Sequence, residues 1–177
     1  MQWQVLLAVT TSIIISLLAL LATFYQLRLQ RIHNEKSVKP LVQIDLPDRK
    51  NQIAVHIRNN GLGPLIIDRL TFIKNDNTYT SIADCLDLDP KSYMHVSVND
   101  AVKRVVLPNS HLVVFEKNLE NHTEEEIRRI REELTPITLQ MDGRDIYDNT
   151  ITFKRNFEWF SRYSKSKITD ISAVEAH

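Results

Sequence analysis

Glycine is scarce in this chain of 177 residues, and two of its three glycines, Gly61 and Gly63, lie in the stretch "NNGLGPLIID". A dinucleotide-binding loop needs a third glycine followed by a helix, and a P-loop needs Gly-Lys-Ser/Thr. Neither pattern is present after the two glycines, since the next stretch, "LIIDRLTFI", alternates like a strand. Asn60–Gly61 tolerates positive φ and Gly63 allows another unusual backbone angle, which suits a tight reversal of the chain. The stretch is therefore predicted to be a structural turn made by Asn60, Gly61, Gly63 and Pro64.

Cysteine is limited to Cys85, and no charge sign is in excess, with 22 Lys and Arg against 22 Asp and Glu. A single thiol excludes an intrachain disulfide and a structural zinc site built on cysteines, and we expect it to be buried and structural. The six histidines form no HxxxH or HExxH motif. The charge balance gives no reason to expect nucleic-acid binding. We therefore predict no catalytic residue, cofactor, metal or small-molecule substrate, and an enzyme assembled from distant acids and histidines remains the less favoured alternative.

Charge is also absent from one long run, "VLLAVTTSIIISLLALLATFY", which extends from Val5 to Tyr25. A helix of this length, at about 1.5 Å per residue, crosses a hydrocarbon core of about 30 Å. The flank "MQWQ" has no basic residue, whereas a signal peptide needs one. The run is therefore predicted to be a retained transmembrane helix.

The basic residues near this helix all follow it, and they outnumber the one acidic residue there, Glu35. They are Arg28, Arg31, Lys36 and Lys39. Because such residues stay on the cytoplasmic side, the N-terminus is predicted to lie outside and the rest of the chain in the cytoplasm. Small residues also form a stripe along the helix that would allow self-association or pairing with a partner's helix. The stripe comprises Ala8, Ser12, Ser16, Ala19 and Thr23.

Beyond the span, the sequence predicts a mainly β fold, in which an antiparallel β-sandwich carries one inserted helix. Period-two alternation in "LVQIDL", "IAVHIR" and "LIIDRLTFI" favours strands, and "TEEE" at Thr123–Glu126 fits a capping box. We expect "RVVLP" to pair with "HLVVFE" as a hairpin, and a second hairpin to turn at Asp142–Gly143. The predicted segments are a flank at 1–4, the span at 5–25, a helical stalk at 26–39, the sandwich at 40–155 and an aromatic-basic, partly disordered segment at 156–177.

The turn "NNGLGPLII" resembles the Asn-x-Gly-x-Gly-Pro turn of small bacterial proteins with one N-terminal span before an immunoglobulin-like or late-embryogenesis-abundant-like β-sandwich. The stretch "RDIYDNTITF" is similar to a late hairpin of some of these proteins, although Asn149–Thr150 replaces the glycine expected there. The resemblance implies a fold and a membrane anchor, and it implies no activity. The predicted location is a bacterial inner membrane.

Aromatic and basic residues alternate in the late stretch "FKRNFEWFSRYSKSK". Aromatic rings at an interface and basic side chains suit contact with anionic lipid, while packing of the aromatic residues into the core is the equally weighted alternative. The predicted lipid-surface residues are Arg28, Arg31, Lys154, Arg155, Trp159, Arg162 and Lys165.

These patterns together predict a single-pass membrane protein whose cytoplasmic β-sandwich is a protein-interaction or scaffolding module. Its expected partners are membrane lipid and a protein, or a second copy, that associates through the span. The alternative is an extracytoplasmic sandwich of opposite topology that binds a carbohydrate or a lipid.

Overall fold

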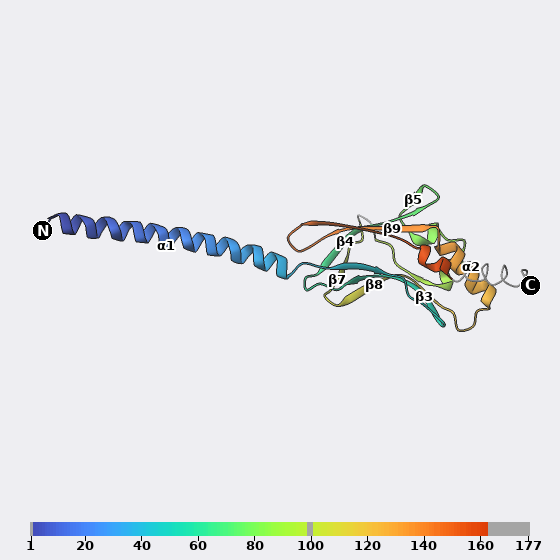
Figure 1. Ribbon diagram of the computed structural model, residues 1–177. Helices are drawn as coiled ribbons and strands as arrows, with labels where there is room; N and C mark the ends of the chain where they lie inside the picture. Colours follow the sequence, from blue (N-terminus) through green and yellow to red (C-terminus); the bar gives the residue numbers. More distant parts are fainter. Residues whose placement is uncertain (1, 99–100, 163–177) are drawn as a thin grey trace, which may run out of the picture. The chain divides into compact units, whose positions relative to one another are not determined.

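The computed structural model describes residues 2–98 and 101–162, which form an N-terminal helix and a mainly β domain (Figure 1). The chain divides after Val38 into two compact units, and the second unit begins at Lys39. Within the described residues the second unit contains ten β-strands, one α-helix and three short 3-10 helices. The prediction of a mainly β fold with one additional helix is confirmed.

Helix α1 (Gln2–Ser37) is one continuous helix, and none of its residues is buried. It is apolar enough over its first part to cross a membrane. The helix continues well beyond Tyr25 and ends shortly before Pro40, whose ring disfavours helix in the residue before it. The helical stretch after the apolar run therefore has the extent expected from the position of this proline.

Two antiparallel sheets make up the β domain. The first sheet has the order β1 (Val42–Asp45), β3 (Gln52–Asn59), β8 (Ser110–Asn118), β6 (Met94–His95), with β2 (Asp48–Arg49) also paired to β3. The second has the order β10 (Thr150–Asn156), β9 (Ile137–Arg144), β4 (Leu65–Lys74), β5 (Asn77–Tyr79), with β7 (Arg104–Val106) also paired to β4. Both sheets contribute to one cluster of buried apolar side chains.

The alternation seen in the sequence determines which faces of the strands are buried. In β3, Ile53, Val55 and Ile57 belong to the shared core, and β9 buries every second residue along its whole length. Helix α2 (Glu124–Leu134) buries Ile127, Ile130 and Leu134, which lie on one face at helical spacing.

Two predicted hairpin details are wrong. Strands β7 and β8 do not pair, because β7 joins β4 in one sheet and β8 joins β3 in the other, so the loop between them crosses between sheets. Strands β9 and β10 do form a hairpin, but Asp142 and Gly143 lie inside β9 and the turn follows at residues 145–149. A Cβ atom on Gly143 would lie 2.4 Å from the Ile66 carbonyl oxygen, so this glycine permits close approach of β4.

None of the three glycines has a positive φ angle, so the turn does not use the backbone freedom that Gly61 and Gly63 offer. A Cβ atom on Gly61 would lie 2.4 Å from both the Leu41 nitrogen and the Lys39 oxygen. Glycine is therefore required here by the close passage of the chain that leads into β1. The stretch from Asn60 to Pro64 connects β3 in one sheet to β4 in the other.

Candidate functional site

Strand register brings four connections together at one end of the β domain. In the first sheet Val42 and Ser110 both pair with Asn59, and in the second Leu65 pairs with Val106 while its neighbour Ile66 pairs with Arg144. The segments that leave these positions are residues 39–41, 60–64, 107–109 and 145–149. This end is called the Lys39 end, and the opposite end, which carries α2 and the 3-10 helix η3 (Glu158–Ser161), is called the α2 end (Figure 1).

The Lys39 end is organised by the buried side chain of Asn59. Its Oδ1 accepts hydrogen bonds from the backbone nitrogens of Leu41 at 3.2 Å and Gly61 at 3.0 Å. Its Nδ2 donates to the carbonyl oxygens of Gly63 at 2.7 Å and Val106 at 3.1 Å. All four hydrogen-bonding positions of the amide are therefore used, and they join three segments that are distant in sequence.

The α2 end is organised by a buried carboxylate, Asp48, whose side chain is fully inaccessible. Arg131 of α2 donates to both of its oxygens, at 3.2 Å from Nε and 3.0 Å from Nη2. Arg162 lies 3.2 Å from Oδ2 and also donates to the Asp48 carbonyl oxygen. One carboxylate thus ties α2 and the end of η3 to the turn after β1, in the paired form that a buried charge requires.

Trp159 provides an exposed aromatic ring at the same end. The Arg162 guanidinium carbon lies 4.0 Å from the centre of this ring, at cation–π distance. Half of Trp159 remains accessible, while Phe157 and Phe160 are fully buried. A shallow hollow beside the ring is lined by Arg155, Asn156, Glu158, Trp159, Ser161 and Arg162. The late aromatic residues therefore divide between the core and an exposed surface.

Two of the predicted lipid-surface residues are already bound to other groups within the domain. Arg155 donates to the Ile44 carbonyl oxygen and Arg162 is engaged with Asp48, so both cations already have anionic or polar partners. Lys154 and Trp159 are exposed, Arg28 and Arg31 belong to α1, and Lys165 lies outside the described residues. The proposed lipid contact of this set stays a prediction.

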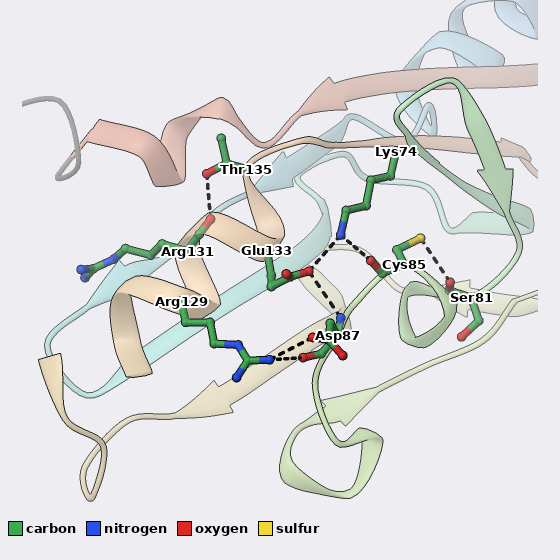
Figure 2. Close-up of polar contacts among 8 residues, drawn as sticks. All are labelled: Lys74, Ser81, Cys85, Asp87, Arg129, Arg131, Glu133 and Thr135. Atoms are coloured by element: carbon green, nitrogen blue, oxygen red, sulfur yellow. Dashed lines mark hydrogen bonds and ion pairs between the residues drawn. The ribbon is translucent and has the colours of Figure 1, made fainter. Parts of the chain in front are cut away.

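A second polar cluster fixes α2 to the segment after β5, as Figure 2 shows. Glu133 Oε2 accepts from Lys74 Nζ at 2.9 Å and from the Asp87 nitrogen at 3.4 Å. Lys74 also donates to the Cys85 carbonyl oxygen at 2.7 Å, and Arg129 pairs with Asp87 at 2.9 Å. The Glu133 carboxylate therefore joins β4, α2 and the intervening segment.

The thiol of Cys85 is buried in this segment, next to the 3-10 helix η1 (Ile82–Asp84). Burial raises its pKa to about 11, although the charge of Lys74 opposes this shift. Its sulfur lies 3.6 Å from the Ser81 carbonyl oxygen, to which it donates. At neutral pH Cys85 is therefore protonated, which suits a structural thiol rather than a nucleophile.

Two histidines and a glutamate gather on the first sheet. His56 of β3 lies 3.4 Å from Glu116 Oε2, and its ring centre is 4.6 Å from that of His111. Burial of His56 lowers its pKa, the hydrogen bond that its ring donates to Glu116 opposes this, and the nearby charges of His111 and Arg58 lower it further. Among the described residues no group of three or more His, Cys, Asp or Glu is placed to hold a metal ion.

The lowered pKa of His56 predicts that the protein loses stability in mild acid. Because the folded state binds this proton less readily than the unfolded state, the free energy of unfolding should fall as the pH drops below about 6.5. His56→Gln should remove this part of the dependence, whereas Glu116→Gln should extend it to lower pH, because Glu116 opposes the lowering of the His56 pKa. Urea unfolding between about pH 5 and pH 8 measures the effect, and an unchanged slope in His56→Gln would contradict it.

The predicted helix-pairing stripe lies on α1, where the hydroxyl groups of Ser16 and Thr23 are satisfied within the helix. Ser16 donates to the Ser12 carbonyl oxygen at 2.8 Å and Thr23 donates to that of Ala19 at 2.9 Å. Hydroxyls paired in this way can face lipid or a second helix without an unmatched donor. The stripe is therefore available for close packing, and pairing through it stays a prediction.

Sequence analysis missed the two polar residues that organise the ends, Asn59 and Asp48. Asn59 directly precedes the predicted turn, so an asparagine at the end of an alternating strand was the available signal. Asp48 stands in the polar stretch "PDRKNQ" and carries no local sign of burial. Its partners Arg131 and Arg162 are distant in sequence, and only the fold brings them together.

Comparison with known proteins finds no matching family and no matching curated relative for this chain. The resemblance to single-span bacterial β-sandwich proteins therefore stays a prediction.

Proposed function

We propose that this chain is a single-pass membrane protein whose β domain is a protein-interaction or scaffolding module on the cytoplasmic face of a bacterial inner membrane. In this proposal the two antiparallel sheets pack as an immunoglobulin-like β-sandwich around their shared core. Helix α1 anchors the module, and the α2 end of the domain carries the surface that a protein partner binds.

The observation that carries the proposal is the uncovered apolar surface of α1. Large apolar side chains from Val5 to Phe24 are at least half exposed, and no residue of the helix is buried. In water such a surface would be strongly unfavourable, at about 25 cal/mol for each Å² of apolar area left exposed. A lipid bilayer covers this surface completely, and the backbone of the helix satisfies its own hydrogen bonds there.

The orientation is supported by the charges that follow the apolar run. Arg28, Arg31 and Lys36 all lie on the C-terminal part of α1, where Arg31 forms an ion pair with Glu35 at 3.3 Å. Both members of that pair are solvent-accessible, so it neutralises little of the local positive charge. An excess of basic residues directly after a span favours the cytoplasmic side.

The α2 end is the surface best suited to a protein partner. Trp159 combines an accessible ring with a fixed orientation over Arg162, and tryptophan and arginine are the residues most often found at the energetic centre of interfaces. The ion pair between Arg162 and Asp48 holds this surface in place before a partner arrives. Such preorganisation lowers the entropy cost of binding.

Topology labelling tests the first half of the proposal. In a Cys85→Ala background, a single cysteine at Asp76, an exposed position in the β4–β5 turn, should react with a membrane-impermeant maleimide only after the inner membrane is opened. A matched cysteine at Gln2 should react in intact spheroplasts. Reaction of the Asp76 position in intact spheroplasts would instead support the extracytoplasmic carbohydrate- or lipid-binding alternative.

Site-specific cross-linking tests the second half. A photoreactive amino acid at Trp159 should give a discrete cross-linked protein in native membranes, and the same group at the exposed Lys91 should not. Arg162→Ala, which removes the partner of the Trp159 ring, should reduce the yield of a cross-linker placed at Glu158. Equal products from Trp159 and Lys91 would contradict a partner surface centred on Trp159.

A further inference from the structure

Five large apolar side chains are exposed at the tips of the connections that form the Lys39 end. They are between 45% and 70% exposed, and they come from four separate segments of the chain. They are Leu41, Leu62, Leu107, Ile146 and Tyr147, and together they are called the loop-tip patch. Single exposed apolar residues are common on soluble domains, whereas a gathering at one end of a fold marks an interaction surface.

The backbone beneath the loop-tip patch is held in place. Leu41 and the residues on both sides of Leu62 hydrogen-bond to Asn59, and Leu107 follows Val106, whose carbonyl accepts from the same side chain. Asp145 accepts from the backbone nitrogens of Tyr147 at 2.8 Å and Asn149 at 3.0 Å. The apolar tips are therefore presented by fixed loops, and their exposure is a property of the fold.

Chain continuity attaches this end of the domain to the candidate membrane helix. Leu41 follows Ser37, the last residue of α1, by only four positions. A helix of 36 residues is about 54 Å long and spans about 51 Å at a typical tilt of about 20°. A bilayer with its headgroups is about 40–45 Å thick, so the end of α1 lies within about 10 Å of the headgroup layer, and less at a larger tilt.

The part of α1 beyond the apolar run also has the character of an interfacial segment. Leu27, Leu29 and Ile32 are exposed apolar residues that alternate with Arg28 and Arg31. Long basic side chains of this kind extend to the headgroups while apolar neighbours remain in the acyl boundary. Lys39 adds a further cation at the Lys39 end, where anionic lipid would attract it.

We propose that the loop-tip patch inserts into the headgroup layer of the membrane that α1 spans. The Lys39 end of the domain then contacts lipid, and the α2 end faces the cytoplasm. This inference rests on the proposed membrane anchoring. It assigns the lipid contact to the loop tips, whereas the exposed Trp159 surface at the opposite end stays free for a protein partner.

Depth-dependent fluorescence quenching tests this assignment on the full chain. Single cysteines at Leu62, Leu107 and Ile146, in a Cys85→Ala background, are labelled with an environment-sensitive fluorophore. The protein is then reconstituted into vesicles of zwitterionic and anionic lipid that contain a quencher attached either to the headgroup, for the loop-tip labels, or to the acyl chain, for the Leu17 label. Asp76, exposed at the α2 end, is the matched control position, and Leu17, within the apolar run, reports on anchoring.

The label at each loop tip should emit at shorter wavelength than the Asp76 label and should be quenched several-fold more strongly. A Leu62→Asp/Leu107→Asp variant should reduce quenching at Ile146, because two charges in the patch oppose insertion. Quenching at Leu17 without quenching at the loop tips would overturn the inference and leave the anchoring intact. No quenching by acyl-chain quenchers at Leu17 would overturn the anchoring itself.

A second copy of the chain is the competing occupant of the loop-tip patch. In that case the blue shift at the loop tips would disappear as protein is diluted into lipid, and energy transfer between labelled copies would replace quenching by lipid. That result would overturn the lipid assignment. A blue shift and lipid quenching that persist with one chain per nanodisc would support it.

Discussion

Replacing Asp48 with asparagine should lower the free energy of unfolding by about 3 kcal/mol, because it removes the charge of the buried carboxylate that pairs with both Arg131 and Arg162. Breaking a buried ion pair by removal of one member typically costs about 3–5 kcal/mol. The two arginine side chains keep 16% and 26% of their accessibility, so water can compensate part of the loss. We therefore expect the lower end of this range.

Asp87→Asn is the matched control, since Asp87 also pairs with an arginine of α2 but is 85% exposed. Exposed ion pairs contribute about 1 kcal/mol or less, so this variant should remain close to wild type. Urea unfolding of the full chain in detergent, followed by Trp159 fluorescence in a Trp3→Phe background, measures both effects. Equal losses in the two variants would show that Asp48 is not the organising charge of the α2 end.

The elements of the fold that depend on short sequence patterns were predicted well. Alternation identified β3 and β4, and the capping box at Thr123 is present with both of its hydrogen bonds, including one of 2.7 Å from the Thr123 nitrogen to Glu126. These features depend on residues close in sequence, where backbone period and hydrogen-bonding chemistry act directly.

The pairing of strands was harder to predict because it depends on the shared core. Between β7 and β8 the residues at 107–109 have the length and composition of a hairpin turn, and Asn109 has a positive φ of 56°. The chain nevertheless crosses between sheets, since Val106 and Phe115 are both buried in the same core from different sheets. Local turn chemistry does not distinguish a hairpin from such a crossing.

Whether a candidate surface could be recognised in the sequence also depends on whether its residues are close together in the chain. The span and its basic flank are contiguous in sequence and could be recognised directly. The loop-tip patch could not be recognised in the sequence, because its members are isolated apolar residues in four polar connections. They include Leu41, Leu62, Leu107 and Ile146. Strand register alone places them at one end of the domain. The same register separates this end from Trp159, which gives the domain two chemically different ends.

Replacing Asn59 with alanine should destabilise the domain by about 3–5 kcal/mol, since it leaves two backbone N–H groups and two carbonyl groups without their hydrogen-bond partner. Each unsatisfied buried group costs about 1–3 kcal/mol, and partial access of water to Leu41 reduces the sum. Asn60→Ala is the matched control, because Asn60 is exposed and its side chain bonds only to Gln43, at 2.9 Å.

Asn59→Asp separates the hydrogen-bonding role of this residue from its shape. The new side chain keeps an acceptor for Leu41 and Gly61 but directs a second oxygen at the carbonyl oxygens of Gly63 and Val106. Burial and these carbonyls should raise the pKa of the introduced carboxyl group, so the folded state binds its proton more tightly than the unfolded state. The free energy of unfolding of this variant should therefore rise, relative to wild type, as the pH falls through the raised pKa toward the ordinary aspartate pKa of about 4. A difference from wild type that is independent of pH would mean that Asn59 fills space at the Lys39 end without organising it through hydrogen bonds.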